Sequence, residues 1–366
     1  MRFHWFLPTT GDGYAVRNST IRLDVDGVTA PSRPADLGYL AQVAQAAESA
    51  GFTAALTPTG AGCPDPWITC AALTQHTERL KFLVAFRPGF VLPTLLTQQA
   101  RAFQEVSRGR LLVNIVTGGD PVEQRAYGDF LDHDQRYART DEFLTVLRRT
   151  FDGKPVDFSG EHYRIEGWQA ADPLAPAPEI YFGGASAAAE RVAAAHSDVH
   201  LMWGEPPAMI AQRIERVRAL AARTGRSLRF GIRLHVIARD TAAEAWRDAE
   251  RLLEGMSPER IEAMQRYYAR MDSVGQARMA ALHGGSTRSL EVSPNLWAGG
   301  GLVREGAGTA LVGDYAEVAQ RIEEYHALGV DEFVLSGWPH LEEAYRVGEY
   351  VLPRLGTPSP TPEPAS

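Results

Sequence analysis

The sequence predicts a (β/α)8 barrel with insertion segments, the longest of them between strands seven and eight. Three observations support this prediction. Short apolar runs alternate with longer amphipathic helical patterns along most of the 366 residues. Such alternation favours parallel strands joined by right-handed crossovers. Eight strand–helix units can close a barrel, and the chain is long enough for one barrel with insertions.

The predicted elements follow each other in regular order. The predicted strands are residues 2–7, 54–57, 80–85, 111–116, 179–182, 199–202, 229–237 and 332–336. The predicted helices are residues 36–50, 94–106, 140–151, 187–195 and 207–224, with a last helix from residue 341. Gly51 directly follows the first helix and is typical of a helix C-terminal cap. We therefore expect one barrel domain over residues 1–355 and a disordered, Pro-rich tail at 356–366.

Two segments interrupt the repeat. Residues 11–34 form a long polar connection after the first strand, and residues 241–310 separate the seventh strand from the eighth. The second segment contains two helical stretches and then Gly-rich stretches. Long loops of barrels are often functional lids, so we predict that residues 284–308 form a mobile lid over the active site. A flexible connector is the alternative.

Composition and charge exclude several classes of protein. The net charge is −8 and no basic block stands out, so nucleic acid is not an expected partner. The two cysteines, Cys63 and Cys70, are too few for a secreted disulfide scaffold, and their spacing is not that of a zinc site. The N-terminus lacks a signal-peptide pattern, and no apolar run is long enough to span a membrane. We expect a cytoplasmic protein without a metal.

The seventh predicted strand carries the strongest site signal. In F-G-I-R-L-H-V-I the apolar residues alternate with Gly231, Arg233 and His235, which therefore face the barrel interior. Charged side chains are costly to bury without partners, so we interpret Arg233 and His235 as active-site residues. A buried ion pair with a barrel carboxylate is the alternative.

The segment Y-F-G-G-A-S-A-A-A-E predicts a phosphate site. A strand runs into Gly183 and Gly184, then Ala185 and Ser186, and a helix begins there. Free N–H groups and the helix dipole at such a junction attract anions. The alternative is that Ser186 only caps the helix.

Barrel active sites lie at the carboxyl ends of the strands. Polar residues that the sequence places at this end are Thr10, Thr57, Thr59, Cys63, Arg87, Asn114, Thr117, Trp203, Ser336, Trp338 and His340. Asn114 lies in an otherwise apolar strand and fits the edge of a flavin ring or a structural hydrogen bond. Tyr137 packs either on a cofactor or on the core. Cys63 is either reactive or inert, and Cys70 is expected in the core.

Several stretches carry a resemblance to a known family. They are Phe3–Gly13, V-T-G-G-D at 116–120, W-G-E-P-P at 203–207, F-G-I-R-L-H-V-I at 230–237, D-S-V-G-Q at 272–276, P-N-L-W-A-G at 294–299, G-A-G-T-A-L-V-G-D at 306–314 and P-H-L-E-E-A-Y-R at 339–346. On these stretches the chain resembles the FMNH2-dependent alkanesulfonate monooxygenases of the bacterial luciferase-like group.

The resemblance implies a two-component oxidoreductase. A separate NAD(P)H-dependent reductase would supply FMNH2, consistent with the lack of a G-x-G-x-x-G fingerprint after a strand. FMNH2 and O2 would oxygenate the carbon that bears a sulfonate, releasing sulfite and an aldehyde. The family also implies a homodimer or homotetramer.

The resemblance and the strand ends together assign three groups of residues. The expected catalytic residues are Arg233, His235, Arg304 and Cys63, with His235 as a proton donor or as a ligand of the oxygenated flavin. The expected substrate residues are Trp203, Trp338, His340 and Thr10. The expected cofactor residues are Thr57, Thr59, Asn114, Thr117, Tyr137, Gly184, Ala185 and Ser186.

Two departures from the family pattern concern the substrate. Family members commonly have His at the position of Thr10 and Tyr at the position of Trp338. The sequence leaves three alternative functions open. They are oxygenation of a sulfone with reduced FMN, hydride transfer with a deazaflavin, and binding of FMN without catalysis.

Overall fold

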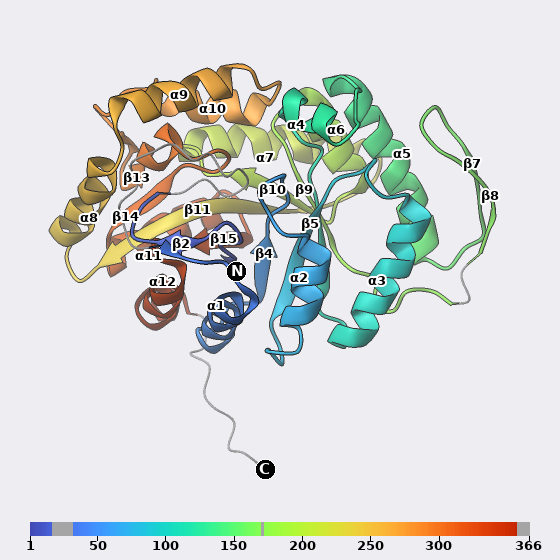
Figure 1. The fold of residues 1–366 in the computed structure, drawn as a ribbon, viewed down its shortest axis with the longest axis horizontal. Helices are drawn as coiled ribbons and strands as arrows, with labels where there is room; N and C mark the ends of the chain where they lie inside the picture. Colours follow the sequence, from blue (N-terminus) through green and yellow to red (C-terminus); the bar gives the residue numbers. More distant parts are fainter. Residues whose placement is uncertain (17–31, 170–171, 357–366) are drawn as a thin grey trace, which may run out of the picture.

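A computed structural model describes residues 1–16, 32–169 and 172–356. Its centre is a closed barrel of eight parallel strands surrounded by helices (Figure 1). The strands, in order around the barrel, are β1 (Arg2–Phe6), β4 (Ala54–Thr57), β5 (Lys81–Phe86), β6 (Leu111–Ile115), β9 (Ile180–Gly183), β10 (Val199–Trp203), β11 (Arg229–Arg239) and β15 (Glu332–Ser336). The pairing of β10 with β11 closes the ring. The predicted (β/α)8 barrel is therefore confirmed.

The barrel helices pack their apolar faces on the outward side chains of the strands. They are α1 (Leu37–Ser49), α2 (Pro66–Leu73), α3 (Pro93–Ser107), α5 (His133–Phe151), α6 (Ala187–His196), α7 (Pro207–Ala222), α11 (Tyr315–Ala327) and α12 (His340–Arg346), which continues into short turns at Val347–Val351 and Leu352–Leu355. On β11, Phe230, Ile232, Leu234 and Val236 join this core, as their alternation predicts.

Some helices differ from the sequence prediction. Helix α5 begins at His133, seven residues before the predicted start, because Asp132 and Gln135 form a capping box that ends the preceding loop. Helices α2 and α11 were not predicted. Asp314 and Glu317 form a second capping box at the start of α11. The same four-residue pattern therefore marks the true starts of α5 and α11, which were not located from the sequence.

The insertion between β11 and β15 is the longest, as predicted, and has more structure than the sequence indicated. It contains α8 (Ala242–Glu254), α9 (Pro258–Ala269), α10 (Val274–His283), β12 (Glu291–Ser293), β13 (Leu296–Trp297), a 3-10 turn at Gly299–Leu302 and β14 (Ala310–Asp314). β14 pairs in parallel with the far half of β11, and β13 pairs with β14. A second apolar cluster joins these elements to β11.

The Gly-rich segment, residues 284–308, for which we predicted a mobile lid, is partly folded and buried in this structure, and its mobility stays a prediction. Residues 284–308 include β12 and β13, and Gly299–Leu302 is buried. A Cβ on Gly308 would lie 2.4 Å from the Cα of Gly301, so glycine is required there for close packing of two backbone segments. Tight packing thus explains glycine at Gly301 and Gly308, whereas a Cβ on Gly284 would meet nothing within 4 Å.

Smaller elements complete the fold. β2 (Asp12–Gly13) pairs with β3 (Ser32–Arg33), α4 (Pro121–Ala126) follows β6, and the hairpin of β7 (Val156–Ser159) and β8 (Arg164–Trp168) projects away from the barrel (Figure 1). Most of the predicted polar connection and nearly all of the predicted tail lie outside the described residues. In the described ranges no helix is long and apolar enough to cross a bilayer.

A buried polar network fills the amino-terminal end of the barrel. The carboxylate of Glu332 on β15 is fully buried, and Oε2 lies 2.9 Å from Nε2 of His4 on β1. Glu332 also accepts hydrogen bonds from Tyr181 and Arg229. This end of a barrel supports stability rather than catalysis, so we assign the network a structural role.

Candidate active site

A cavity of about 230 Å³ opens at the carboxyl end of the barrel. Every barrel strand except β15 contributes lining residues from its end or from the loop that follows it. The insertion adds residues from the start of α10 and from the loop before β14. Predicted site residues that line this cavity are Thr59, Asn114, Thr117, Tyr137, Gly184, Ala185, Ser186, Trp203, Arg233 and Arg304.

Two buried arginines line this cavity, together with the ion pairs Arg87–Glu123 and Arg213–Glu205 and with Glu305. Arg233 on β11 and Arg304 in the insertion are each 4% exposed, and both guanidinium groups lie over the ring of Phe6, at 4.4 and 5.7 Å from its centroid. Burial lowers the pKa of Arg233 well below its usual value, and the positive charge of Arg304 lowers it further. Burial lowers the pKa of Arg304 to about 10.

In the described part of the chain, every hydrogen bond of these two guanidinium groups goes to a neutral acceptor. Arg233 donates to the carbonyls of Leu234 and Val334 and to Ser336 Oγ. Arg304 donates to the carbonyls of Glu305 and Ala307. The alternative of a buried ion pair between Arg233 and a barrel carboxylate is therefore wrong for the described residues. Two adjacent buried cations of this kind are suited to an anionic ligand.

His235 is fully buried but does not line the cavity. Its Nδ1 lies 2.6 Å from Ser336 Oγ, its Nε2 lies 3.1 Å from the Ala307 carbonyl, and its ring stacks on Trp338 at 4.1 Å. Burial and then the charges of Arg233 and Arg304 lower the pKa of His235 well below its usual value. Both ring nitrogens of His235 thus face protein atoms in this structure, and its expected role as a proton donor stays a prediction.

The junction of β9 and α6 has the form of a phosphate cradle. Ser186 is the N-cap of α6, its Oγ accepting from Ala189 N at 3.2 Å, and its side chain also lines the cavity. Gly184 has φ +140°, and a Cβ there would lie 2.5 Å from Ala189 Cβ and 3.1 Å from Tyr137 Oη. Burial raises the pKa of Tyr137, so its phenol remains protonated and can donate. Ser186 can therefore cap α6 and also contact an anion bound in the cavity.

Three predicted substrate residues meet in a second, smaller cavity of about 20 Å³. Thr10, Trp338 and His340 line it, and it shares Phe6 and Arg304 with the main cavity. His340 is anchored because its Nδ1 lies 2.9 Å from Oδ1 of the buried Asp12. The two departures from the family pattern, Thr10 and Trp338, are therefore neighbours.

Two other predicted residues are away from both cavities. Thr57 is buried against the helix layer, with Oγ1 3.0 Å from Cys70 Sγ, so it is not placed to contact a cofactor. This contact also places Cys70 in the core, as predicted. Cys63 lines neither cavity, and burial raises the pKa of its thiol to about 11. The thiol is therefore protonated at neutral pH, which does not fit a reactive thiolate.

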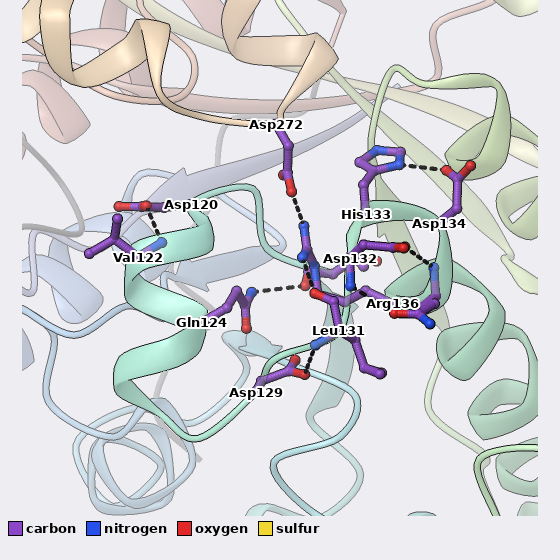
Figure 2. A network of polar contacts seen from close by, with 12 residues as sticks. Asp120, Val122, Gln124, Asp129, Leu131, Asp132, His133, Asp134, Arg136 and Asp272 are labelled. Carbon is purple, nitrogen blue, oxygen red and sulfur yellow. Dashed lines mark hydrogen bonds and ion pairs between the residues drawn. The ribbon is translucent and has the colours of Figure 1, made fainter.

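The insertion forms a roof that ion pairs fasten to the barrel loops. Arg136 of α5 is 1% exposed and donates to Asp272 Oδ2 at 2.6 Å, which joins α5 to the loop before α10 (Figure 2). Asp272 N also donates to the Gly119 carbonyl. On the other side, Arg278 of α10 donates to both oxygens of the buried Glu205, which follows β10. These contacts hold α10 over the cavity.

Removing the charge of Asp272 should loosen this roof. In Asp272→Asn the buried Arg136 faces a neutral amide oxygen in place of the carboxylate, so the charge-assisted hydrogen bond and the ion pair are lost. We expect the free energy of unfolding to fall by about 1–2 kcal/mol in urea titration, together with faster hydrogen exchange in α10. Glu262→Gln is the matched control, because it removes one charge from an exposed pair with Arg266. Equal exchange in α10 of both variants would contradict the role of this pair.

Several lining residues were not assigned from the sequence. They include Phe6, Arg87, Glu123, Gln276 and Glu305. Arg87 directly follows a predicted strand, which was the available signal. Phe6 and Gln276 both lie in family stretches, whereas Glu123 and Glu305 carry no sequence signal that separates them from core or surface residues.

Comparison with known proteins agrees with this architecture. Residues 1–332 match the luciferase-like monooxygenase family. Riboflavin lyase RcaE, solved with modified FMN and riboflavin, is 21% identical with TM-score 0.76 over 97% of this chain and 91% of that one. DmoA from Hyphomicrobium sulfonivorans is 20% identical with TM-score 0.76 over 100% and 90%. EDTA monooxygenase EmoA from Chelativorans sp. BNC1 is 20% identical with TM-score 0.74 over 99% and 96%.

These structures share the fold, and the match over residues 1–332 covers most of the chain. The chain belongs to the luciferase-like monooxygenase family.

Proposed function

We propose that this protein is a flavin-dependent monooxygenase that cleaves the carbon–sulfur bond of a small organosulfonate. The observation that carries the proposal is the pair Arg233 and Arg304, which are buried at one cavity and donate only to neutral acceptors among the described residues. A sulfonate stays anionic at neutral pH and offers three acceptor oxygens, which suit two guanidinium groups.

The cavity fits FMN at two places. Ser186, Gly184 and Tyr137 form the cradle that would hold the phosphate, because the N-terminus of α6 offers free N–H groups there. Asn114, Thr117 and Thr59 line the part of the cavity available to the ring. Reduced FMN, when bound, supplies the two electrons that activate O2. RcaE, a structural neighbour, was solved with a modified FMN.

The overall reaction balances as follows. A sulfonate R–CH2–SO3⁻, O2 and FMNH2 give an aldehyde, hydrogen sulfite, FMN and water. The C–S bond breaks, a C–O bond forms at the same carbon, and the second oxygen atom leaves as water. Arg233 and Arg304 hold the sulfonate and the charge that develops on the departing sulfite, Trp203 supplies an apolar wall, and the roof excludes bulk water.

FMNH2 would come from a separate reductase, because the sequence offers no dinucleotide fingerprint for NAD(P)H. We propose a transient encounter with an NAD(P)H-dependent FMN reductase. We also propose a cytoplasmic homodimer or homotetramer, following the family resemblance.

A panel of sulfonates with photochemically reduced FMN and air tests the function. We expect stoichiometric sulfite and aldehyde with at least one sulfonate, and no sulfite without O2. Product from sulfones alone would favour the sulfone alternative, and substrate oxidation without O2 using a reduced deazaflavin would favour hydride transfer. FMN binding with no turnover of any compound would favour a silent flavoprotein.

Ser186→Ala tests the phosphate cradle. Loss of one hydrogen bond should weaken FMN binding by about 1 kcal/mol, measured by flavin fluorescence. Riboflavin, which lacks the phosphate, is the internal control and should bind both proteins equally. An unchanged FMN affinity would contradict the assignment.

Trp338→Tyr tests whether Trp338, one of the two departures from the family pattern, sets the substrate preference. The indole adds an apolar wall beside Thr10 and Arg304 and removes a phenol. We expect the ratio of kcat/KM between short and long sulfonates to change by roughly fourfold, which corresponds to the ~0.8 kcal/mol of one buried methylene group. The same ratio in both proteins would show that Trp338 does not set the preference.

A further inference from the structure

A continuous chain of hydrogen bonds connects the two cavity arginines behind the cavity wall. Arg233 Nη2 lies 2.8 Å from Ser336 Oγ, and Ser336 Oγ lies 2.6 Å from His235 Nδ1. His235 Nε2 lies 3.1 Å from the Ala307 carbonyl, and Arg304 Nη1 lies 2.7 Å from the same carbonyl. The chain starts on β11, crosses to the end of β15 and ends in the insertion.

Of the two neutral tautomers of His235, only one satisfies every link. A guanidinium group has no acceptor, so Arg233 must donate to Ser336. Ser336 then uses its single proton to donate to His235 Nδ1. The remaining ring proton lies on Nε2 and is donated to the Ala307 carbonyl. A doubly protonated ring would also satisfy these links, because Ser336 Oγ can accept from both Arg233 and Nδ1–H, but the Ser336 proton would then lose His235 as its acceptor.

The surroundings of His235 favour the same state. The charged or titratable groups that act on it are Arg233, Arg304 and His340, and Trp338 covers one face of its ring. Two adjacent guanidinium charges and full burial disfavour an imidazolium. His235 is therefore a neutral link that is both a donor and an acceptor.

We infer that Ser336 and His235 are positioning residues that fix Arg304, on the insertion, relative to Arg233, on the barrel, so that the two guanidinium groups act as one anion site. In this role His235 transfers no proton to the substrate. The inference rests on the proposed function only for the identity of the anion. Because Arg304 is already ordered, anion binding does not carry the entropy cost of fixing its side chain, and the anion binds more tightly.

The proton placement is testable on the wild-type protein. In ¹⁵N-histidine NMR at neutral pH, the resonance that His235→Gln removes should show the neutral Nε2–H form. An imidazolium or an Nδ1–H form would overturn the inference. This measurement requires neither a substrate nor a stable Ser336 variant.

The positioning role is testable with inorganic sulfate as the probe anion, by calorimetry on the full chain. Ser336→Ala should raise the Kd for sulfate about tenfold, because a hydrogen bond to a charged group is lost. Ser197→Ala is the matched control, since Ser197 is a buried serine that donates to the Ala193 carbonyl at the other end of the barrel. It should leave the Kd unchanged.

A second pair of variants separates positioning from proton transfer. His235→Gln keeps one donor and one acceptor but cannot carry the charge, and we expect its sulfate affinity and sulfite release to exceed those of His235→Leu by about tenfold. Equal losses in both variants, or equal Kd values for Ser336→Ala and Ser197→Ala, would overturn the inference. If no sulfonate is turned over but sulfate binding follows this pattern, the proposed substrate fails and the positioning role stands.

Discussion

Replacing Arg233 by Met should lower kcat/KM for sulfonate cleavage by a factor that corresponds to about 2–5 kcal/mol, or roughly 30- to several-thousand-fold. Arg233 lies on a barrel strand, so its position is fixed before the anion arrives. Methionine retains much of the side-chain volume but offers no donor and no charge. The loss is measured as sulfite release under saturating FMNH2 and O2.

Two further variants show whether the loss comes from the anion site or from the removal of any positive charge. Arg251→Met, on the exposed face of α8, removes a charge far from the cavity and should leave kcat/KM unchanged. Arg304→Met should cause a loss similar to that of Arg233→Met, and the double variant should lose less than the sum, because one anion contacts both groups. Full sulfite release by Arg233→Met would refute the anion site.

Replacing Glu332 by Ala should lower the free energy of unfolding by about 3–5 kcal/mol without altering the cavity. Its carboxylate is fully buried and is the shared acceptor of His4, Tyr181 and Arg229 at the closed end of the barrel. Removal leaves these groups buried without their common partner. Urea unfolding gives the loss, and FMN affinity should be unchanged.

The pH dependence of this loss has a defined sign. Burial by itself would raise the pKa of Glu332, but His4, Tyr181 and Arg229 together lower it. The stabilisation is therefore fully present above the unfolded pKa, ~4.3, and is lost as pH falls through the lower folded value. The difference between wild type and Glu332→Ala should shrink only below about pH 4. A loss no larger than that of Glu250→Ala, an exposed site on α8, would contradict the network's role.

The barrel strands could be located from the sequence because each is a short apolar run between turns. On β11, alternation alone assigned Phe230 to the helix layer and Arg233 to the interior. Successive side chains of a strand point to opposite faces of the sheet, so this assignment depends only on neighbouring residues and holds for any strand with two different faces. The starts of α5 and α11 were missed although their capping boxes are equally local.

Side chains outside regular alternation could not be placed this way. Thr57 and Thr59 are two residues apart, yet only Thr59 lines the cavity, because the strand ends at Thr57. His235 follows Arg233 on the same face of β11 but lies behind Trp338, which reaches it from the loop after β15. Such contacts depend on segments about a hundred residues apart in sequence.

The sequence by itself determined the barrel, the inward direction of Arg233 and His235, and the strand–glycine–helix junction at Ser186, because each follows from local periodicity or local backbone geometry. Only the tertiary structure decided which side chains share the cavity, that Gly301 and Gly308 pack against each other in the insertion, and that His235 links two arginines. The physical reason is that burial and hydrogen-bond partners come from residues distant in the chain, and these set both the charge state and the accessibility of a group.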